Sequence, residues 1–227
     1  MLTDILKIKK GLTAVVGSGG KTSLMYKLAE ELSVYSKVII CTTTHIFEPE
    51  HIITLIEPTE EGIKAAFKNN NCICIGNKNK NGKLIACDME FSKLVKYADY
   101  IIAEADGSKG LPLKAHAEYE PFIPKESVQT ITVLGIKGIG KPIKDICHRP
   151  QLYADILKTD VNTVVTAEMA AKVINYENIG DLVIINQVEN EKDIINAQII
   201  AENIHKPVYA GEIRKGELYV CSNKGCR

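Results

Sequence analysis

The sequence carries no net charge, because its 28 basic residues are balanced by 28 acidic ones. Nothing in that balance favours a nucleic-acid backbone or an anionic membrane as partner. No segment approaches the roughly 20 apolar residues that span a bilayer. Asp4 and Lys7 interrupt the apolar N-terminus, which therefore lacks the features of a secretory leader. These absences predict a cytoplasmic protein that binds neither nucleic acid nor membrane.

The sequence also lacks internal repeats, low-complexity tracts and a clear linker. Its apolar content of 45% over 227 residues is enough for a full core, so we expect one domain over residues 1–227. The seven cysteines are an odd number and are scattered along the chain. This distribution favours reduced, structural thiols over a disulfide framework.

Strand-like and helix-like segments alternate for most of the length. Several of the strand-like segments are continuous apolar runs, which are typical of strands buried on both faces of a mainly parallel sheet. We therefore predict an α/β fold, a three-layer α/β/α domain resembling P-loop NTPases. The expected strands are residues 12–16, 37–41, 72–75, 100–103, 130–134, 182–185, 207–210 and 218–220, and the expected helices include 60–68, 89–96, 168–174 and 191–203.

A glycine-rich segment lies between the first apolar run and a helical pattern of leucines. A strand, a glycine loop, Lys-Thr and a helix, in that order, can wrap backbone N–H groups around a phosphate. The glycines allow positive φ and close approach of the main chain to a ligand. Lys21 can reach the terminal phosphates, and the Thr22 hydroxyl can bind Mg²⁺. We predict ATP or GTP as ligand, Mg²⁺ as cofactor, and nucleotide binding by Gly17, Ser18, Gly19, Gly20, Lys21, Thr22 and Ser23.

This loop is shorter than the usual eight-residue form, because Val15 stands where that form begins with glycine. The resulting pattern G-x-x-G-K-T resembles the phosphate loops of Mur-type ligases. The alternative interpretation is a tight turn between a strand and a helix, with the lysine on the surface. The apolar strand before the loop and the helical pattern after it favour phosphate binding.

Two carboxylates, Glu104 and Asp106, follow the apolar run of residues 100–103. P-loop enzymes place an acidic residue there to hold Mg²⁺ or to orient a nucleophile. On an extended strand both side chains would point to one side, where a cation would relieve their repulsion. The Thr43 hydroxyl, after the strand of residues 37–41, is a further candidate metal ligand. Alternatively, the carboxylates mark the point where the strand leaves the core, and threonines suit strand ends.

Residues 108–124 form a long connection without clear secondary structure, and such connections are usually functional or disordered. This one combines Lys109, Lys114 and His116 with apolar residues, which favours an ordered loop that lines the site. A proline-fixed surface crossing is the alternative. Arg149, one of only three arginines, could neutralise charge on a transferred phosphoryl group with its rigid fork. An ordinary salt bridge would explain it equally well.

Four motifs in order are similar to those of the YqeC family, and shorter motifs extend the likeness over most of the chain. The four are the glycine loop, a threonine-histidine segment, the acidic strand end and a leucine-proline run. They read Gly17-Ser18-Gly19-Gly20-Lys21-Thr22, Thr42-Thr43-Thr44-His45, Glu104-Ala105-Asp106-Gly107-Ser108 and Leu111-Pro112-Leu113-Lys114-Ala115, followed by Leu134-Gly135, Gly140-Lys141-Pro142 and His148-Arg149-Pro150.

Members of the YqeC family are described as accessory proteins of selenium-dependent molybdenum hydroxylases, or as selenium cofactor biosynthesis proteins. The resemblance implies a P-loop nucleotide-binding protein that serves maturation of such a hydroxylase. It implies the hydroxylase or its maturation factors as partners. It also places Lys21 and Thr22 at the phosphate and the metal, and Glu104 with Asp106 at the acidic strand end.

The segment that begins at Asn186 reads Asn-Gln-Val-Glu. An Asn-Lys-x-Asp sequence here would read guanine, because its carboxylate accepts N–H groups of the base and its lysine stem covers the ring. Gln187 replaces that lysine and Glu189 replaces the aspartate. Asn186 and Glu189 are therefore candidate nucleotide-binding residues with the base left open. An ordinary strand-to-helix turn is the alternative.

Three functions fit these features. In a Mg²⁺-dependent NTPase or phosphotransferase, Lys21 would hold the phosphates while Thr22 and Glu104 fix the metal. Asp106 or His116 would position water or an acceptor. In a nucleotide-gated binding module, the nucleotide would instead order the loops for a partner. The third is a Mur-like ATP-dependent ligase, although full Mur enzymes carry further domains that this chain is too short to include.

Overall fold

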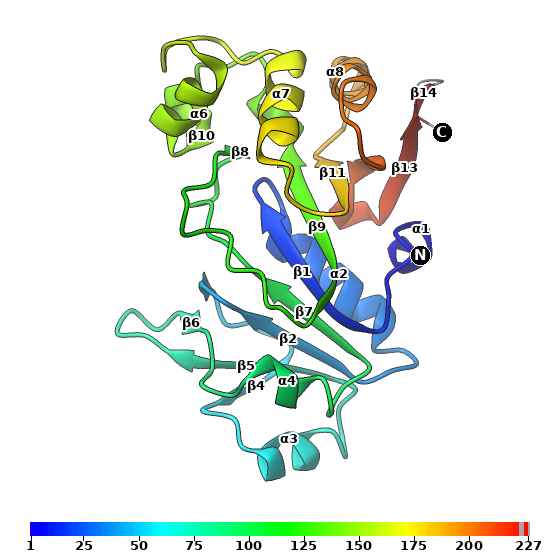
Figure 1. Cartoon of the computed structure of the whole chain (residues 1–227). Coiled ribbons are helices and arrows are strands. Elements are labelled where there is room, and N and C mark those ends of the chain that lie inside the picture. The colour runs from blue at the N-terminus through cyan, green and yellow to red at the C-terminus, as the bar shows by residue number, and fades with distance from the viewer. Residues whose placement is uncertain (223–224, 227) are drawn as a thin grey trace. The chain divides into compact units, whose positions relative to one another are not determined.

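The computed structural model describes residues 1–222, 225 and 226. Strands that are mainly parallel are flanked by helices (Figure 1), which confirms the predicted α/β class and is consistent with a three-layer α/β/α arrangement. The chain forms two compact units. The N-terminal unit comprises Met1–Val15, Thr22–Gly107 and Phe122–Thr130, and the C-terminal unit comprises Val16–Lys21, Ser108–Pro121 and Ile131–Arg227. The single domain over residues 1–227 stays a prediction.

Four parallel strands form the centre of the N-terminal unit, in the order β1 (Gly11–Gly17, of which residues 11–15 belong to this unit), β7 (Tyr100–Glu104), β2 (Val38–Thr42) and β5 (Cys72–Lys78). All five residues of β2 and of β7 are buried, as their continuous apolar runs predict. Three short strands complete this sheet: β4 (Ile53–Ile56) parallel to β5, β6 (Leu84–Ile85) antiparallel to β5, and β3 (His45–Ile46) antiparallel to β6.

Helix α2 (Lys21–Leu32) follows the glycine loop directly. Its predicted stripe of Leu24, Leu28 and Leu32 is buried, which explains why this segment is helical. Its Glu31 accepts backbone N–H bonds from α1 (Leu2–Ile5), at 3.0 Å from Leu2 and 2.9 Å from Thr3. The remaining helices of the unit are α3 (Glu60–Ala66) and α4 (Phe91–Leu94).

The C-terminal unit contains the parallel strands β9 (Ser127–Gly135, of which residues 131–135 belong to this unit), β11 (Leu182–Asn186) and β12 (Val208–Glu212). Strand β13 (Glu217–Ser222) runs antiparallel to β12, and β14 (Gly225–Cys226) antiparallel to β13. Within the connection that the sequence left without secondary structure, β8 (Leu113–Lys114) pairs with β10 (Cys147–His148) in a separate two-stranded sheet. The connection is therefore ordered.

Helices α7 (Ala167–Glu177) and α8 (Glu191–Glu202) pack against each other, as Figure 1 shows. They begin at side-chain caps, because Thr166 accepts the N–H of Met169 and Asn190 accepts the N–H of Asp193. Their small and aliphatic residues join one apolar core with the strands. The remaining helical elements are α5 (Ile143–Ile146), α6 (Pro150–Leu157) and the 3₁₀ turns η1 (Ile136–Gly138) and η2 (Ile213–Lys215).

Five cysteines are free thiols: Cys41, Cys72, Cys74, Cys87 and Cys147. Burial raises the pKa of Cys147 to about 12, so its thiol is protonated at neutral pH. The expectation of reduced thiols is wrong at Cys221, which is disulfide-bonded on β13. The spacing of cysteines in the sequence did not indicate this bond. Through the described residues, none of the helices has the length and apolar character needed to cross a bilayer.

Candidate functional site

The glycine loop adopts backbone angles that favour glycine, as predicted. Its φ angles are +92° at Gly17, +73° at Gly19 and +137° at Gly20. A Cβ atom at Gly19 would overlap the backbone of Gly135, and one at Gly20 would overlap the Asn186 amide. The main chain of the loop thus packs closely against the rest of the C-terminal unit. This packing fixes the shape of the loop before any ligand binds.

Hydrogen bonds from three elements hold the loop in place. The Ser18 N–H donates to the Val133 carbonyl at 2.9 Å, and its hydroxyl donates to the Pro112 carbonyl at 2.8 Å. The Asn186 side-chain amide donates to the Gly19 carbonyl at 2.8 Å. These bonds anchor the loop to β9, to the 108–121 segment and to the end of β11, and a loop held in this way is preorganised.

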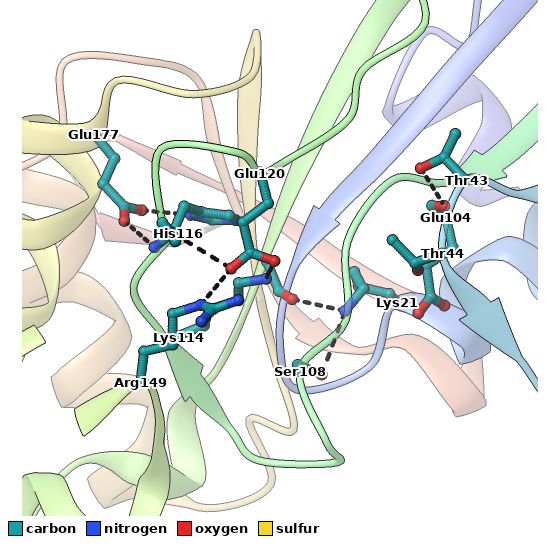
Figure 2. A network of polar contacts seen from close by, with 12 residues as sticks. Lys21, Thr43, Thr44, Glu104, Ser108, Lys114, His116, Glu120, Arg149 and Glu177 are labelled. Carbon is teal, nitrogen blue, oxygen red and sulfur yellow. Dashed lines mark hydrogen bonds and ion pairs between the residues drawn. The ribbon is translucent and has the colours of Figure 1, made fainter. Parts of the chain in front are cut away.

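Lys21 folds back over the loop that precedes it. Its Nζ donates to the Gly17 carbonyl at 2.7 Å and to the Ser108 hydroxyl at 3.3 Å (Figure 2). The residue is only 4% exposed. A buried ammonium group positioned by a glycine loop is suited to bind an anion that replaces one of these neutral acceptors.

Within the N-terminal unit, the Thr22 hydroxyl donates to Glu104 Oε2 at 3.0 Å. Glu104 is the last residue of β7 and is 6% exposed. Thr22 follows Lys21 directly in the chain and lies in the first turn of α2. A hydroxyl and a carboxylate are both hard oxygen ligands, so this pair fits a Mg²⁺ that completes its shell with phosphate oxygens and water.

Asp106 is fully buried. Because β7 ends at Glu104, the extended strand expected to align the two carboxylates does not reach Asp106. Among the described residues there is also no group of three His, Cys, Asp or Glu side chains that could hold a metal. A Mg²⁺ site built on one hydroxyl, one carboxylate and phosphate does not require such a group.

The predicted threonines also gather around Glu104. The Thr42 hydroxyl donates to the Glu104 carbonyl at 3.1 Å, and Thr43 donates to the same carbonyl at 3.4 Å and to Phe122 at 3.2 Å. The Thr44 N–H donates to the Thr42 hydroxyl at 2.9 Å. These bonds use the hydroxyl hydrogen of Thr43, and its oxygen retains lone pairs. A metal-ligand role for Thr43 stays a prediction.

His116 forms a buried pair with Glu177 at the end of α7. Glu177 accepts the His116 backbone N–H at 2.6 Å and contacts Nδ1 at 2.8 Å, and the two side chains are 5% and 8% exposed (Figure 2). The pair fastens the 108–121 segment to α7. The sequence did not indicate it, because the two residues are separated by 61 positions.

Arg149 and Lys114 both bind Glu120. Arg149 Nε lies 2.6 Å from Oε1, and Lys114 Nζ lies 3.0 Å from Oε2 (Figure 2). Arg149 also stacks over the Tyr119 ring, with 5.1 Å to its centroid. Burial would raise the pKa of Glu120, but the hydrogen bonds from Arg149 and Lys114 outweigh it and lower the pKa from 4.5. The contacts of Arg149 are therefore those of a salt bridge, the alternative interpretation from the sequence.

Asn186 and Glu189 have different surroundings. The Asn186 side chain, besides holding Gly19, accepts the Ile213 N–H at 3.0 Å. Glu189 forms a 3.0 Å ion pair with Lys137, and its pKa is lowered chiefly by the hydrogen bond from that lysine. Lys137 also binds Asp193 at 2.6 Å. Asn186 thus supports the glycine loop. Glu189 is an ionised carboxylate bound by Lys137 of η1.

Comparison with known proteins identifies the relatives of this chain. The model of the family described as "YqeC protein" matches residues 13–151, which include the glycine loop, Glu104, Asp106 and Arg149 but end before Asn186. A protein of Escherichia coli (strain K12) described as "Uncharacterized protein YqeC" is 38% identical over 151 residues, which are 63% of this chain and 59% of that protein. The chain thus matches over less than two thirds of that relative's length. Because the family model matches more than half of the residues of this chain, the chain belongs to the YqeC family.

Proposed function

We propose that this protein binds a nucleoside triphosphate with Mg²⁺ and hydrolyses it or transfers its phosphoryl group. One observation carries the proposal: a rigidly anchored glycine loop places the Lys21 ammonium against its own Gly17 carbonyl, and the next residue, Thr22, is hydrogen-bonded to Glu104. The order of groups is the one that P-loop proteins use for a phosphate and its metal.

The loop and α2 would bind the phosphates through backbone N–H groups. The first N–H groups of a helix have no partners within the helix and point toward its N-terminal end, where the helix dipole favours negative charge. Helix α2 begins at Lys21, directly after the three positive-φ glycines. A phosphate oxygen would replace the Gly17 carbonyl as acceptor for Lys21 Nζ, exchanging a neutral acceptor for a charged one.

Thr22 and Glu104 would hold the magnesium. When bound, the ion would neutralise charge that develops on the phosphate oxygens during transfer. The Thr22 hydroxyl would turn its lone pair toward the ion, and the largely buried Glu104 carboxylate would bind the ion or one of its waters. Asp106 would position the attacking water or acceptor. His116 is paired with Glu177, and Arg149 is paired with Glu120. We therefore assign both residues to the support of the 108–121 segment.

The Lys21–Ser108 contact favours a second candidate, a nucleotide-gated binding module. Ser108 begins the segment that Ser18 also holds through Pro112. If the Lys21 ammonium group bound a phosphate instead, its hydrogen bond to Ser108 would be lost, and the conformation of the segment that begins at Ser108 would change. The family resemblance makes a selenium-dependent molybdenum hydroxylase or one of its maturation factors the proposed partner. Equal capture of purified partner with and without nucleotide would exclude gating.

Thermal unfolding with ATP, GTP and their diphosphates, each with and without Mg²⁺, tests the proposed function. A ligand at 100 times its Kd stabilises the folded state by about 2.7 kcal/mol, which corresponds to roughly 5–10 °C in Tm for a chain of this size. We expect a Mg²⁺-dependent shift in the wild type and in Lys9→Ala, which changes an exposed lysine, but none in Lys21→Ala. The absence of a shift with every nucleotide would contradict the proposal.

A further inference from the structure

A cavity of about 340 Å³ opens in the C-terminal unit, and no residue predicted from the sequence except Glu189 lines it. Its volume lies at the lower end of the range of small-molecule sites. The lining residues come from the segment after β11, from α8, from β12, from η2 and from β13. They are Val188, Glu189, Ile194, Ala197, Ala210, Lys215, Glu217 and Tyr219.

Asn186 connects this cavity to the glycine loop within the same unit. One end of its side chain donates to Gly19, and the other accepts the N–H of Ile213, two residues before Lys215. Val188 and Glu189 follow Asn186 within three positions. The cavity therefore begins beyond the carboxyl end of β11, at the sheet edge where α/β proteins bind ligands, and extends between α8 and the strands β12 and β13.

The walls of the cavity are suited to a flat ring. Ala197 and Ala210 are buried and small, so they leave room, while Val188, Ile194 and the half-exposed Tyr219 supply apolar surface. The charged groups are two carboxylates, Glu189 and Glu217, and one ammonium, Lys215. Lys137 binds Glu189 from outside this set and keeps it ionised.

We propose that this cavity binds the base of the nucleotide and prefers guanine to adenine; the inference rests on the proposed function. Guanine presents adjacent N1–H and N2–H donors with O6 as acceptor on one edge. The carboxylates of Glu189 and Glu217 match those donors, and Lys215 matches O6. Adenine offers one amino group beside an acceptor nitrogen, which a second carboxylate disfavours. Glu217 of β13 and Lys215 of η2 would thus supply the base contacts that the lysine and aspartate of an Asn-Lys-x-Asp sequence would otherwise make.

Titrations with Mg²⁺ plus GTP, ATP or inorganic tripolyphosphate separate the cavity from the loop. We expect the wild type to bind GTP about tenfold more tightly than ATP or tripolyphosphate, since one net hydrogen bond contributes up to about that factor in affinity. Ala197→Leu, which fills the cavity, and Glu217→Gln should each remove this preference and leave tripolyphosphate affinity unchanged. Glu202→Gln, an exposed change on α8, should have no effect.

A fluorescence measurement tests the cavity without the loop. The chain contains no tryptophan, so Tyr219→Trp places a single reporter at the cavity, and Tyr176→Trp is the exposed control on α7. Guanosine should give a saturable change at position 219 alone, and adenosine a weaker one. Equal affinity for GTP, ATP and tripolyphosphate would overturn the cavity proposal while the loop stands. A guanosine response without tripolyphosphate binding would overturn the proposed function but keep the cavity, and no response to any of these probes would overturn both.

Discussion

Two lysines of the C-terminal unit are almost equally buried, Lys21 at 4% exposure and Lys114 at 5%, but they are held by different partners. Lys114 forms an ion pair with Glu120, which Arg149 also binds. Within the same unit Lys21 donates a 2.7 Å bond to the Gly17 carbonyl. That bond can be exchanged for one to phosphate at little cost, whereas the ion pair of Lys114 with Glu120 resists exchange. The proposed function therefore assigns Lys21 to ligand binding and Lys114 to support of the fold.

The largest effect on turnover should come from replacing Lys21. Lys21→Ala should lower turnover about 10³-fold, because it removes a charged donor from the transferred phosphate, while changing thermal stability little. Lys114→Met should do the reverse and leave turnover of the folded protein within about twofold, since it removes a charge that pairs with Glu120 and that the proposal assigns to support of the fold. Steady-state kinetics with urea unfolding of both variants checks this. Similar turnover losses in the two would remove the distinction between the lysines.

The Glu120 cluster should dominate stability. Glu120→Gln leaves Lys114 and Arg149 facing a neutral amide, so we expect the free energy of unfolding to fall by about 3 kcal/mol. Glu118→Gln changes an exposed carboxylate two positions away and is the matched control, expected to stay within about 0.5 kcal/mol of wild type. Urea denaturation at neutral pH measures both. Equal stability of the two variants would show that the cluster is not structural.

Glu104→Gln should weaken the metal rather than the phosphate interaction. Loss of the carboxylate beside Thr22 should lower turnover about 100-fold at saturating nucleotide and raise the Mg²⁺ concentration needed for half-maximal rate. Glu50→Gln, on the exposed surface of the same unit, serves as control. Magnesium titrations of the rate separate these variants. An unchanged magnesium dependence in Glu104→Gln would exclude Glu104 from the metal site.

The smallest effect concerns acid pH. The pKa of Glu120 is lowered in the folded protein from its usual 4.5. The ionised carboxylate therefore contributes stability above that unfolded value, and the contribution is lost as the pH falls through the folded pKa. Wild type should lose more stability than Glu120→Gln between about pH 5 and pH 3. Urea midpoints across that interval test the sign, and parallel curves for the two proteins would contradict it.

Local patterns in the sequence predicted local structure well. The leucine spacing after Lys21 gave α2, the continuous run of residues 100–103 gave β7, and the glycines gave the positive φ angles of the loop. Each of these features depends on neighbours in the chain. The two-residue strands β8 and β10 were missed, because too few residues contribute to any pattern.

Long-range partners could not be predicted in the same way. The role of Asn186 as the support of Gly19 depends on a contact across 167 positions, and the partners of Arg149 and His116 lie 29 and 61 positions away. Residue type indicated that Arg149 could neutralise charge and that His116 could position water or an acceptor. Only the fold shows which carboxylates they contact. The cavity at Ala197 and Tyr219 likewise arises from packing of α8 against β12 and β13, which no single segment encodes.

Calorimetric titration of GTP in the presence of Mg²⁺ into wild type, Lys21→Ala and Lys114→Met shows whether the glycine loop binds the phosphates. We expect one nucleotide per chain in wild type and in folded Lys114→Met, with dependence on Mg²⁺ in both. Lys21→Ala should lose at least 100-fold in affinity, or about 2.7 kcal/mol. Binding by Lys21→Ala as tight as that of wild type would show that the glycine loop is not the phosphate site.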